Sequence, residues 1–210
     1  MRKFLTLTAG ACAVLLVAAP VAADEEEDQA IADDSVLTLA DLPEGWEEGD
    51  ADTDDPAEGE VPECEAIERA VDRGDEVPNA ESPDFDDSND PNGVTSVSNE
   101  VLVFPKAKAA KRYLRTFDAD GEACLRGRGD LIPGALDVRV EELGVEGSGA
   151  GYTVYITLES NGEEFTLASD LVVVRVGRAI TNFAAENLDE PIPEGPDILD
   201  IVIGRLQESV

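Results

Sequence analysis

The stretch that decides the fold is YTVYITLESNGEEFTLASDLVVVRVGRAITNF, residues 152–183. In its first part, every second side chain is apolar, which is the period of a half-buried β-strand. Asn161-Gly162 and Gly177-Arg178 are two-residue segments typical of tight hairpin turns, and apolar runs flank both of them. The stretch therefore predicts a three-strand antiparallel meander with strands over 152–158, 165–176 and 179–183.

Two further strands are indicated on the N-terminal side of the meander. Residues 94–104 are rich in β-branched and apolar side chains and predict one long strand. Val138 and Val140 alternate with charged residues and predict a shorter one. The glycine-rich residues 147–151 then connect this shorter strand to the meander.

Three segments have the apolar spacing of amphipathic helices. The first covers residues 64–73, the second follows Pro105, and the third starts near Pro196. Cys124 is expected just after the second helix. The predicted buried positions are Ile67, Ala70 and Val71 in the first helix, Ala107, Ala110, Leu114 and Phe117 in the second, and Ile198, Leu199, Val202 and Leu206 in the third.

This order of elements predicts an α+β fold: an antiparallel β-sheet of about five strands with helices packed on one face. The chain has 210 residues, which suits one ordinary domain with its own core. We place that domain at residues 36–210, because the first apolar anchors, ending at Trp46, follow Val36.

The N-terminal residues predict export. Arg2 and Lys3 precede an almost wholly apolar run, and small residues come just before an acidic block, as in a cleavable signal peptide over residues 1–23. Retention of this segment as a membrane anchor is the alternative. Residues 24–35 are acidic without an obvious hydrophobic period and predict a disordered tether. The protein is therefore expected to be secreted.

Composition excludes several kinds of function. The chain has 48 Asp and Glu against 15 Lys and Arg, with a net charge of −33. Such a charge repels phosphates, so we expect no nucleic acid partner and no membrane association after signal cleavage. The sequence contains no histidine, which excludes Ser-His-Asp and Cys-His catalysis and any metal site that depends on imidazole.

The cysteines suit an exported protein. Cys12 lies within the apolar run of the signal segment, where lipidation is an alternative that the preceding residues do not favour. Cys64 and Cys124 remain after cleavage, and in an oxidising compartment one disulfide bond is the default for such a pair.

The element order, the Leu-Pro-Glu-Gly-Trp segment at 42–46, the Cys64/Cys124 pair and the Val-Val-Val-Arg-Val-Gly-Arg-Ala-Ile hairpin at 172–180 together resemble the PknH-like extracytoplasmic sensor domains of actinobacteria. The resemblance spans roughly residues 36–206. It implies a ligand-binding module with a cleft and without catalytic activity. The family usually has a second disulfide bond, which this chain cannot form, and no ligand residue of the family can be transferred to it.

Two acid-rich segments are candidate calcium sites, because calcium prefers carboxylate and carbonyl oxygens. The first resembles an EF-hand loop in its alternation, but Asp55 and Val61 stand where that loop needs Gly and Glu. Solvated acidic loops are the alternative. The candidate ligands are Asp50, Asp52 and Asp54 in the first segment, and Asp84, Asp86 and Asp90 in the second.

A basic patch is predicted on the helix that follows Pro105. Lys108, Arg112 and Arg115 fall on one face at i, i+4 and i+7. The functional interpretation is a docking patch for an anionic ligand or a wall polymer. The alternative is a solvated face that pairs with the protein's own acidic loops.

We hypothesise a secreted, non-enzymatic ligand-binding or sensor-like domain. Its contacts would lie on the open face of the sheet or in a helix cleft, with Trp46, Tyr152, Tyr155 and Arg175 as candidates, each of which also suits the core or its rim. The expected partner is a small ligand, a cell-wall component or a protein, and no cofactor is expected besides calcium. The alternatives are an acidic calcium-binding protein and a hydrolase using two carboxylates, for which abundant acids give no specific signal.

Overall fold

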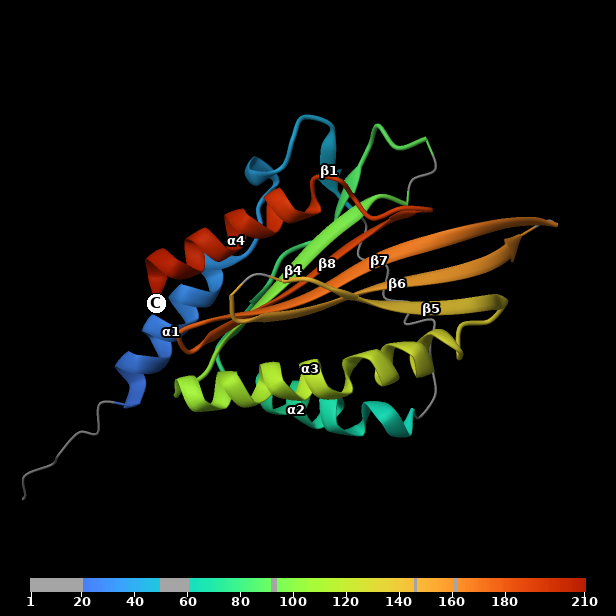
Figure 1. Cartoon of the computed structure of the whole chain (residues 1–210). Coiled ribbons are helices and arrows are strands. Elements are labelled where there is room, and N and C mark those ends of the chain that lie inside the picture. The colour runs from blue at the N-terminus through green and yellow to red at the C-terminus, as the bar shows by residue number, and fades with distance from the viewer. Residues whose placement is uncertain (1–20, 50–60, 92–93, 146, 161) are drawn as a thin grey trace, which may run out of the picture.

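The computed structural model describes residues 21–49, 61–91, 94–145, 147–160 and 162–210. Figure 1 presents the whole arrangement, in which one twisted sheet has helices on both of its faces. The elements, in chain order, are α1 (Val21–Ser35), η1 (Leu39–Asp41), β1 (Trp46–Glu48), η2 (Pro62–Cys64), α2 (Glu65–Asp75), β2 (Asn79–Glu81), β3 (Phe85–Asp87), β4 (Ser96–Val103), α3 (Ala107–Gly129), β5 (Ala135–Leu143), β6 (Gly149–Ser160), β7 (Glu163–Val176), β8 (Ala179–Leu188) and α4 (Gly195–Ser209).

The predicted meander is confirmed. β6, β7 and β8 pair in antiparallel register, with Ser160 opposite Glu163 at the first hairpin and Val176 opposite Ala179 at the second. Gly162 and Gly177 have φ angles of 83° and 57°, which the turns require and which glycine adopts without steric cost. The turn residue Asn161 lies outside the described residues.

The sheet is larger than predicted. Among the described residues it has eight strands in the order β1-β3-β4-β8-β7-β6-β5, with β2 also paired to β4, in place of about five. The additional strands β1, β2 and β3 have three residues each and come from acid-rich segments. Such short strands carry no apolar alternation, because they form by pairing with a neighbour and do not each bury a full face.

The prediction that helices cover one face is wrong. α1 and α4 lie on one face of the sheet, and α2 and α3 lie on the other (Figure 1). The central strands are apolar on both sides: Val172 and Val174 of β7 face α1 and α4, whereas Val173 between them belongs to the cluster under α2 and α3. A strand that is buried on both faces needs cover on both faces.

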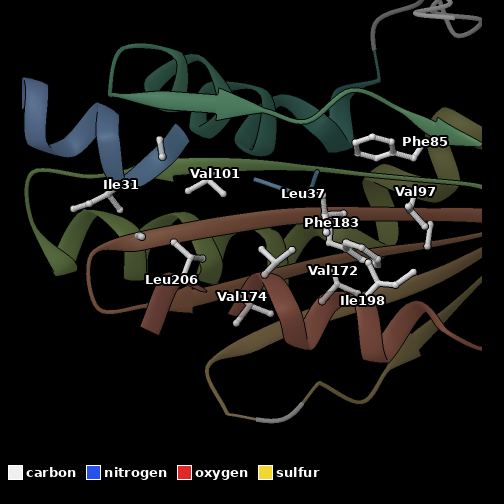
Figure 2. Close-up of a cluster of buried hydrophobic side chains, with 14 of the residues drawn as sticks. Ile31, Leu37, Phe85, Val97, Val101, Val172, Val174, Phe183, Ile198 and Leu206 are labelled. Atoms are coloured by element: carbon white, nitrogen blue, oxygen red, sulfur yellow. The ribbon is translucent and has the colours of Figure 1, made fainter. Parts of the chain in front are cut away.

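The main core lies between the sheet and the pair α1 and α4. Figure 2 shows its side chains converging from the strands and these two helices. α4 contributes three buried residues at helical spacing, Ile198, Val202 and Leu206, as predicted. Asn99 is a buried polar residue of this region, and its side chain accepts a hydrogen bond from the Leu37 amide at 2.8 Å and donates one to Thr181.

The prediction of a disordered tether over 24–35 is also wrong, because these residues belong to α1. Ile31 and Ala32 are buried in the main core, at 8% and 0% exposure. Asp28 accepts two hydrogen bonds from Arg178, and Gln29 donates one to the Asn79 carbonyl at 2.7 Å. The folded unit therefore starts before residue 36. Residues 1–20 of the expected signal peptide lie outside the described residues.

The second predicted helix, which follows Pro105, is longer than expected and extends to Gly129 as α3. Cys124 lies within α3 and not after it, and it forms the predicted disulfide bond with Cys64 at the start of α2. Ala107 and Val71, both predicted to be buried, are exposed, whereas Tyr113, which was not predicted, is buried. No helix in the described part of the chain is long and apolar enough to span a bilayer.

Candidate functional site

Two cavities adjoin the layer formed by α2 and α3. The first, which we call the polar cleft, has a volume of about 490 Å³ and lies between these helices and the sheet. Its floor comes from β4, β7 and β8, and its walls include Ile67 and Val71 of α2 and Phe117 of α3. Tyr113 lines both this cleft and the neighbouring groove, so the two cavities meet at its ring.

The polar cleft is built around three hydrogen-bonding side chains from three elements. Asn182 of β8 stands opposite Glu100 of β4 in the sheet register. Its amide nitrogen donates to the Glu100 carboxylate at 2.6 Å and to the Tyr113 hydroxyl of α3 at 3.0 Å. The Asn182 carbonyl oxygen is buried and has no hydrogen-bond partner in the described structure. A buried acceptor without a donor costs free energy, which a bound molecule can recover.

The chemistry of this cleft is that of hydrogen-bond acceptors. Glu81, Asp84 and Glu100 line it together with Asn182, and no Lys or Arg is among its lining residues. Aromatic and aliphatic walls surround these few polar groups, which is the usual composition of a small-molecule site. The cleft therefore suits a molecule with several donors, such as hydroxyl or amino groups.

The second cavity, which we call the basic groove, has a volume of about 800 Å³ and lies between α2 and the first half of α3. The three residues of the predicted basic patch, Lys108, Arg112 and Arg115, are exposed and all line it. The sequence-derived patch is thus one wall of a groove, and Arg73 of α2 contributes a cation from the other helix.

The four predicted ligand contacts are dispersed. Trp46 packs against the main core from β1. Tyr152 is buried against Phe117, and its hydroxyl donates to the Asp118 carbonyl at 2.9 Å. Burial and the neighbouring Asp118 carboxylate raise the pKa of the Tyr152 hydroxyl.

The other two predicted contacts lie apart from the cleft. Tyr155 projects from the opposite face of β6, where the Arg139 guanidinium lies 4.0 Å from its ring centroid. Arg175 donates to the Gly177 carbonyl at 2.7 Å and to the Ser148 hydroxyl at 3.2 Å near the second hairpin. None of the four residues is among those that line the polar cleft.

The candidate calcium ligands divide between two regions. Asp50, Asp52 and Asp54 lie outside the described residues. In the second segment, Asp90 uses one carboxylate oxygen to accept hydrogen bonds from the Val94 and Thr95 amides, which fixes the loop itself. Among the described residues, no group of three or more acidic or cysteine side chains is placed to hold a metal ion. Calcium binding stays a prediction.

One buried carboxyl group, that of Asp170, was not predicted from the sequence. Asp170 of β7 is 8% exposed and accepts a hydrogen bond from Thr153 at 2.6 Å. It lines a small pocket of about 310 Å³ beside α4, on the face opposite the polar cleft. Burial raises the pKa of this carboxyl above its ordinary value, and the Thr153 hydrogen bond opposes that rise.

Comparison with solved structures shows the fold. The extracellular domain of PknH from Mycobacterium tuberculosis superposes on the chain with a TM-score of 0.52 and 13% identity, covering 88% of this chain and 96% of that domain. LpqN, involved in cell envelope biogenesis of the same organism, overlaps 62% of this chain and 75% of its own at 15% identity and a TM-score of 0.32. No protein family model and no curated protein sequence matches the chain. The resemblance to PknH-like domains that the sequence suggested is therefore present in the fold.

Proposed function

We propose that this chain is a secreted, non-enzymatic ligand-binding domain that holds a small donor-rich molecule in the polar cleft. The single observation that carries the proposal is the buried, unpartnered carbonyl oxygen of Asn182 within an acceptor-lined cavity. A ligand hydroxyl or amino group at that position would satisfy the carbonyl and lie near the Glu100 carboxylate and the Tyr113 hydroxyl. The aromatic and aliphatic walls would cover the apolar parts of the ligand.

Export is supported by two independent features. The N-terminal sequence has the order of a signal peptide, with a basic start, an apolar run and small residues before an acidic block. The Cys64–Cys124 bond persists best in an oxidising compartment. Binding without catalysis is favoured because the chain has no histidine, so no Ser-His or Cys-His pair can act in the cleft.

The test is a thermal-shift panel of glycerol, myo-inositol, glucosamine and spermidine, followed by calorimetric titration of any compound that raises the melting temperature. Asn182→Leu removes the carbonyl with little change in volume. Thr181→Val is the matched control, because it removes a hydroxyl from the next residue of β8, whose side chain faces the main core.

Binding should be lost in Asn182→Leu and retained in Thr181→Val. Glu100→Gln should weaken an amine more than a polyol, because only the amine gains from the full charge of the carboxylate. A compound that binds wild type and Asn182→Leu equally, or a panel without any binder, would contradict the proposal.

A further inference from the structure

The basic groove is set apart by its charge. Six of the fifteen Lys and Arg residues of a chain with net charge −33 line this one cavity. They come from two helices and the segment between β4 and α3, so the fold gathers them from separate places. They are Arg73, Lys106, Lys108, Lys111, Arg112 and Arg115, against the acids Glu76 and Asp120.

These six cations differ from six other described arginines in their pairing. Within the described part of the chain, none of them takes part in an ion pair, whereas six arginines elsewhere do. In a chain with so many carboxylates, an exposed cation would readily find an acid beside it. The structure therefore gives no support, in the residues it describes, to the alternative that the basic patch pairs with the protein's own loops.

The groove is apolar beneath its charged rim. Ala70 and Val77 line it from the side of α2, and Phe104 and Ala109 line it from the start of α3. The Phe104 and Tyr113 rings contact each other with centroids 5.8 Å apart and give this part of the wall a continuous apolar surface. A ligand that used the whole groove would have an apolar body and an anionic group.

The start of α3 adds to the positive potential. This helix of 23 residues has no side-chain cap at Lys106 and no acidic residue in its first turn. The positive end of its dipole is therefore not offset where Lys106 and Lys108 line the groove.

We infer that the basic groove is a second binding site, separate from the polar cleft, for an amphiphilic anion of the phosphorylated-lipid class, taken up as a single molecule. The net charge of −33 disfavours approach to a flat anionic surface, whereas a concave cavity exposes one ligand to the local cations. The phosphate contacts the rim, where Arg112 and Arg115 can form charge-assisted hydrogen bonds, and the acyl chain covers the apolar floor.

The test is calorimetric titration of the mature, oxidised protein with octyl phosphate below its micelle concentration. Tetraethylene glycol monooctyl ether supplies the same chain without the charge and without a sugar, inorganic phosphate supplies the charge without the chain, and vesicles of phosphatidic acid and phosphatidylcholine supply a surface. Lys108→Ala/Arg112→Ala/Arg115→Ala removes three rim cations. Arg69→Ala/Arg126→Ala/Arg139→Ala is the matched control, since it removes three exposed, ion-paired arginines outside the groove.

Octyl phosphate should bind more tightly than either partial ligand. The rim variant should weaken it at least about tenfold, and the control should change it less than about twofold. Raising the salt concentration from about 0.05 M to about 0.5 M should also weaken binding. Asp84→Asn changes a residue that lines the polar cleft and not the groove, and it should leave octyl phosphate binding unchanged, which separates this site from the polar cleft.

Four results would overturn the inference. They are no binding of octyl phosphate, equal losses in the two triple variants, tetraethylene glycol monooctyl ether binding as tightly as octyl phosphate, and binding to vesicles without binding to the monomer. Circular dichroism melts of both variants establish that each is folded, and Arg112→Gln alone should weaken binding in the same direction.

Discussion

Two helical glycines should respond in opposite ways to alanine. Gly204 in α4 has no heavy atom within 4 Å of the position that a Cβ would take, so Gly204→Ala should gain the helix propensity of alanine, about 0.5–1 kcal/mol. Gly121 in α3 is buried, and its added Cβ would overlap the Tyr152 ring. That ring is held by Phe117 and by its hydrogen bond to Asp118. Overpacking typically costs 1–3 kcal/mol, so Gly121→Ala should lower the free energy of unfolding by up to about 2 kcal/mol after the propensity gain.

Urea unfolding followed by far-ultraviolet circular dichroism and by the fluorescence of Trp46, the single tryptophan, measures both variants under the same conditions. In a Tyr152→Leu background, the cost of Gly121→Ala should fall, because the smaller side chain leaves room for the methyl group. If Gly121→Ala stabilised the protein as much as Gly204→Ala does, the close approach of α3 to β6 described here would be refuted.

Three further predictions concern stability and use the same urea assay. Cys64→Ala/Cys124→Ala should lower the free energy of unfolding by about 4 kcal/mol, because the bond closes a loop with a sequence separation of 60 residues; a loss below about 1 kcal/mol would contradict this. Asp28→Ala should lower the free energy of unfolding by about 1–3 kcal/mol, because Asp28 of α1 loses its pairing with Arg178 in the β7–β8 turn. The matched change Glu26→Ala, at an exposed position of α1, should have little effect, and equal effects of the two changes would argue against the packing of α1 on the sheet. The raised native pKa of Asp170 means that the folded state binds a proton more readily than the unfolded state, so wild type loses stability as pH rises from about 3.9 through the native pKa. Asp170→Asn should therefore be the more stable protein at neutral pH, with a gain that shrinks on acidification, and a variant less stable than wild type at neutral pH would reverse the argument.

The sequence was sufficient to predict the meander because its signals are local. Alternation fixes the faces of β6, and the turn glycines fix where the strands end, so neither depends on distant residues. The same holds for α4, whose buried stripe of Ile198, Val202 and Leu206 follows from its spacing alone. The disulfide bond followed from the compartment and from the presence of two cysteines after cleavage.

The elements that were missed depend on tertiary context. α1 is rich in acids and buries few residues, so its sequence predicts a solvated segment, although Ile31 and Ala32 are buried in the core. β2 and β3 form by pairing with β4, and β1 forms by pairing with β3, which no local pattern predicts. The presence of helices on the second face of the sheet was also missed, although the continuous apolar run over 171–174 is typical of a strand buried on both sides.

The site was recovered in part. The basic patch was visible because its three cations repeat at helical spacing, but only the fold reveals that they border a groove. The polar cleft was missed because Glu100, Tyr113 and Asn182 come from three elements separated along the chain. One signal was available: Glu100 directly precedes the apolar residues 101–103, and Asn182 directly precedes the apolar residues 183–185, so each places a polar group beside buried positions.

The most direct test of the account is amide chemical-shift mapping of the isotope-labelled, oxidised protein titrated with the tightest binder of the polyol and amine panel. The account predicts that the largest shifts lie at Glu100, Tyr113 and Asn182 and at their neighbours on β4, α3 and β8. Shifts concentrated instead on the acidic segment 86–90, or on the opposite face of the sheet around Tyr155, would contradict the placement of the ligand site in the polar cleft.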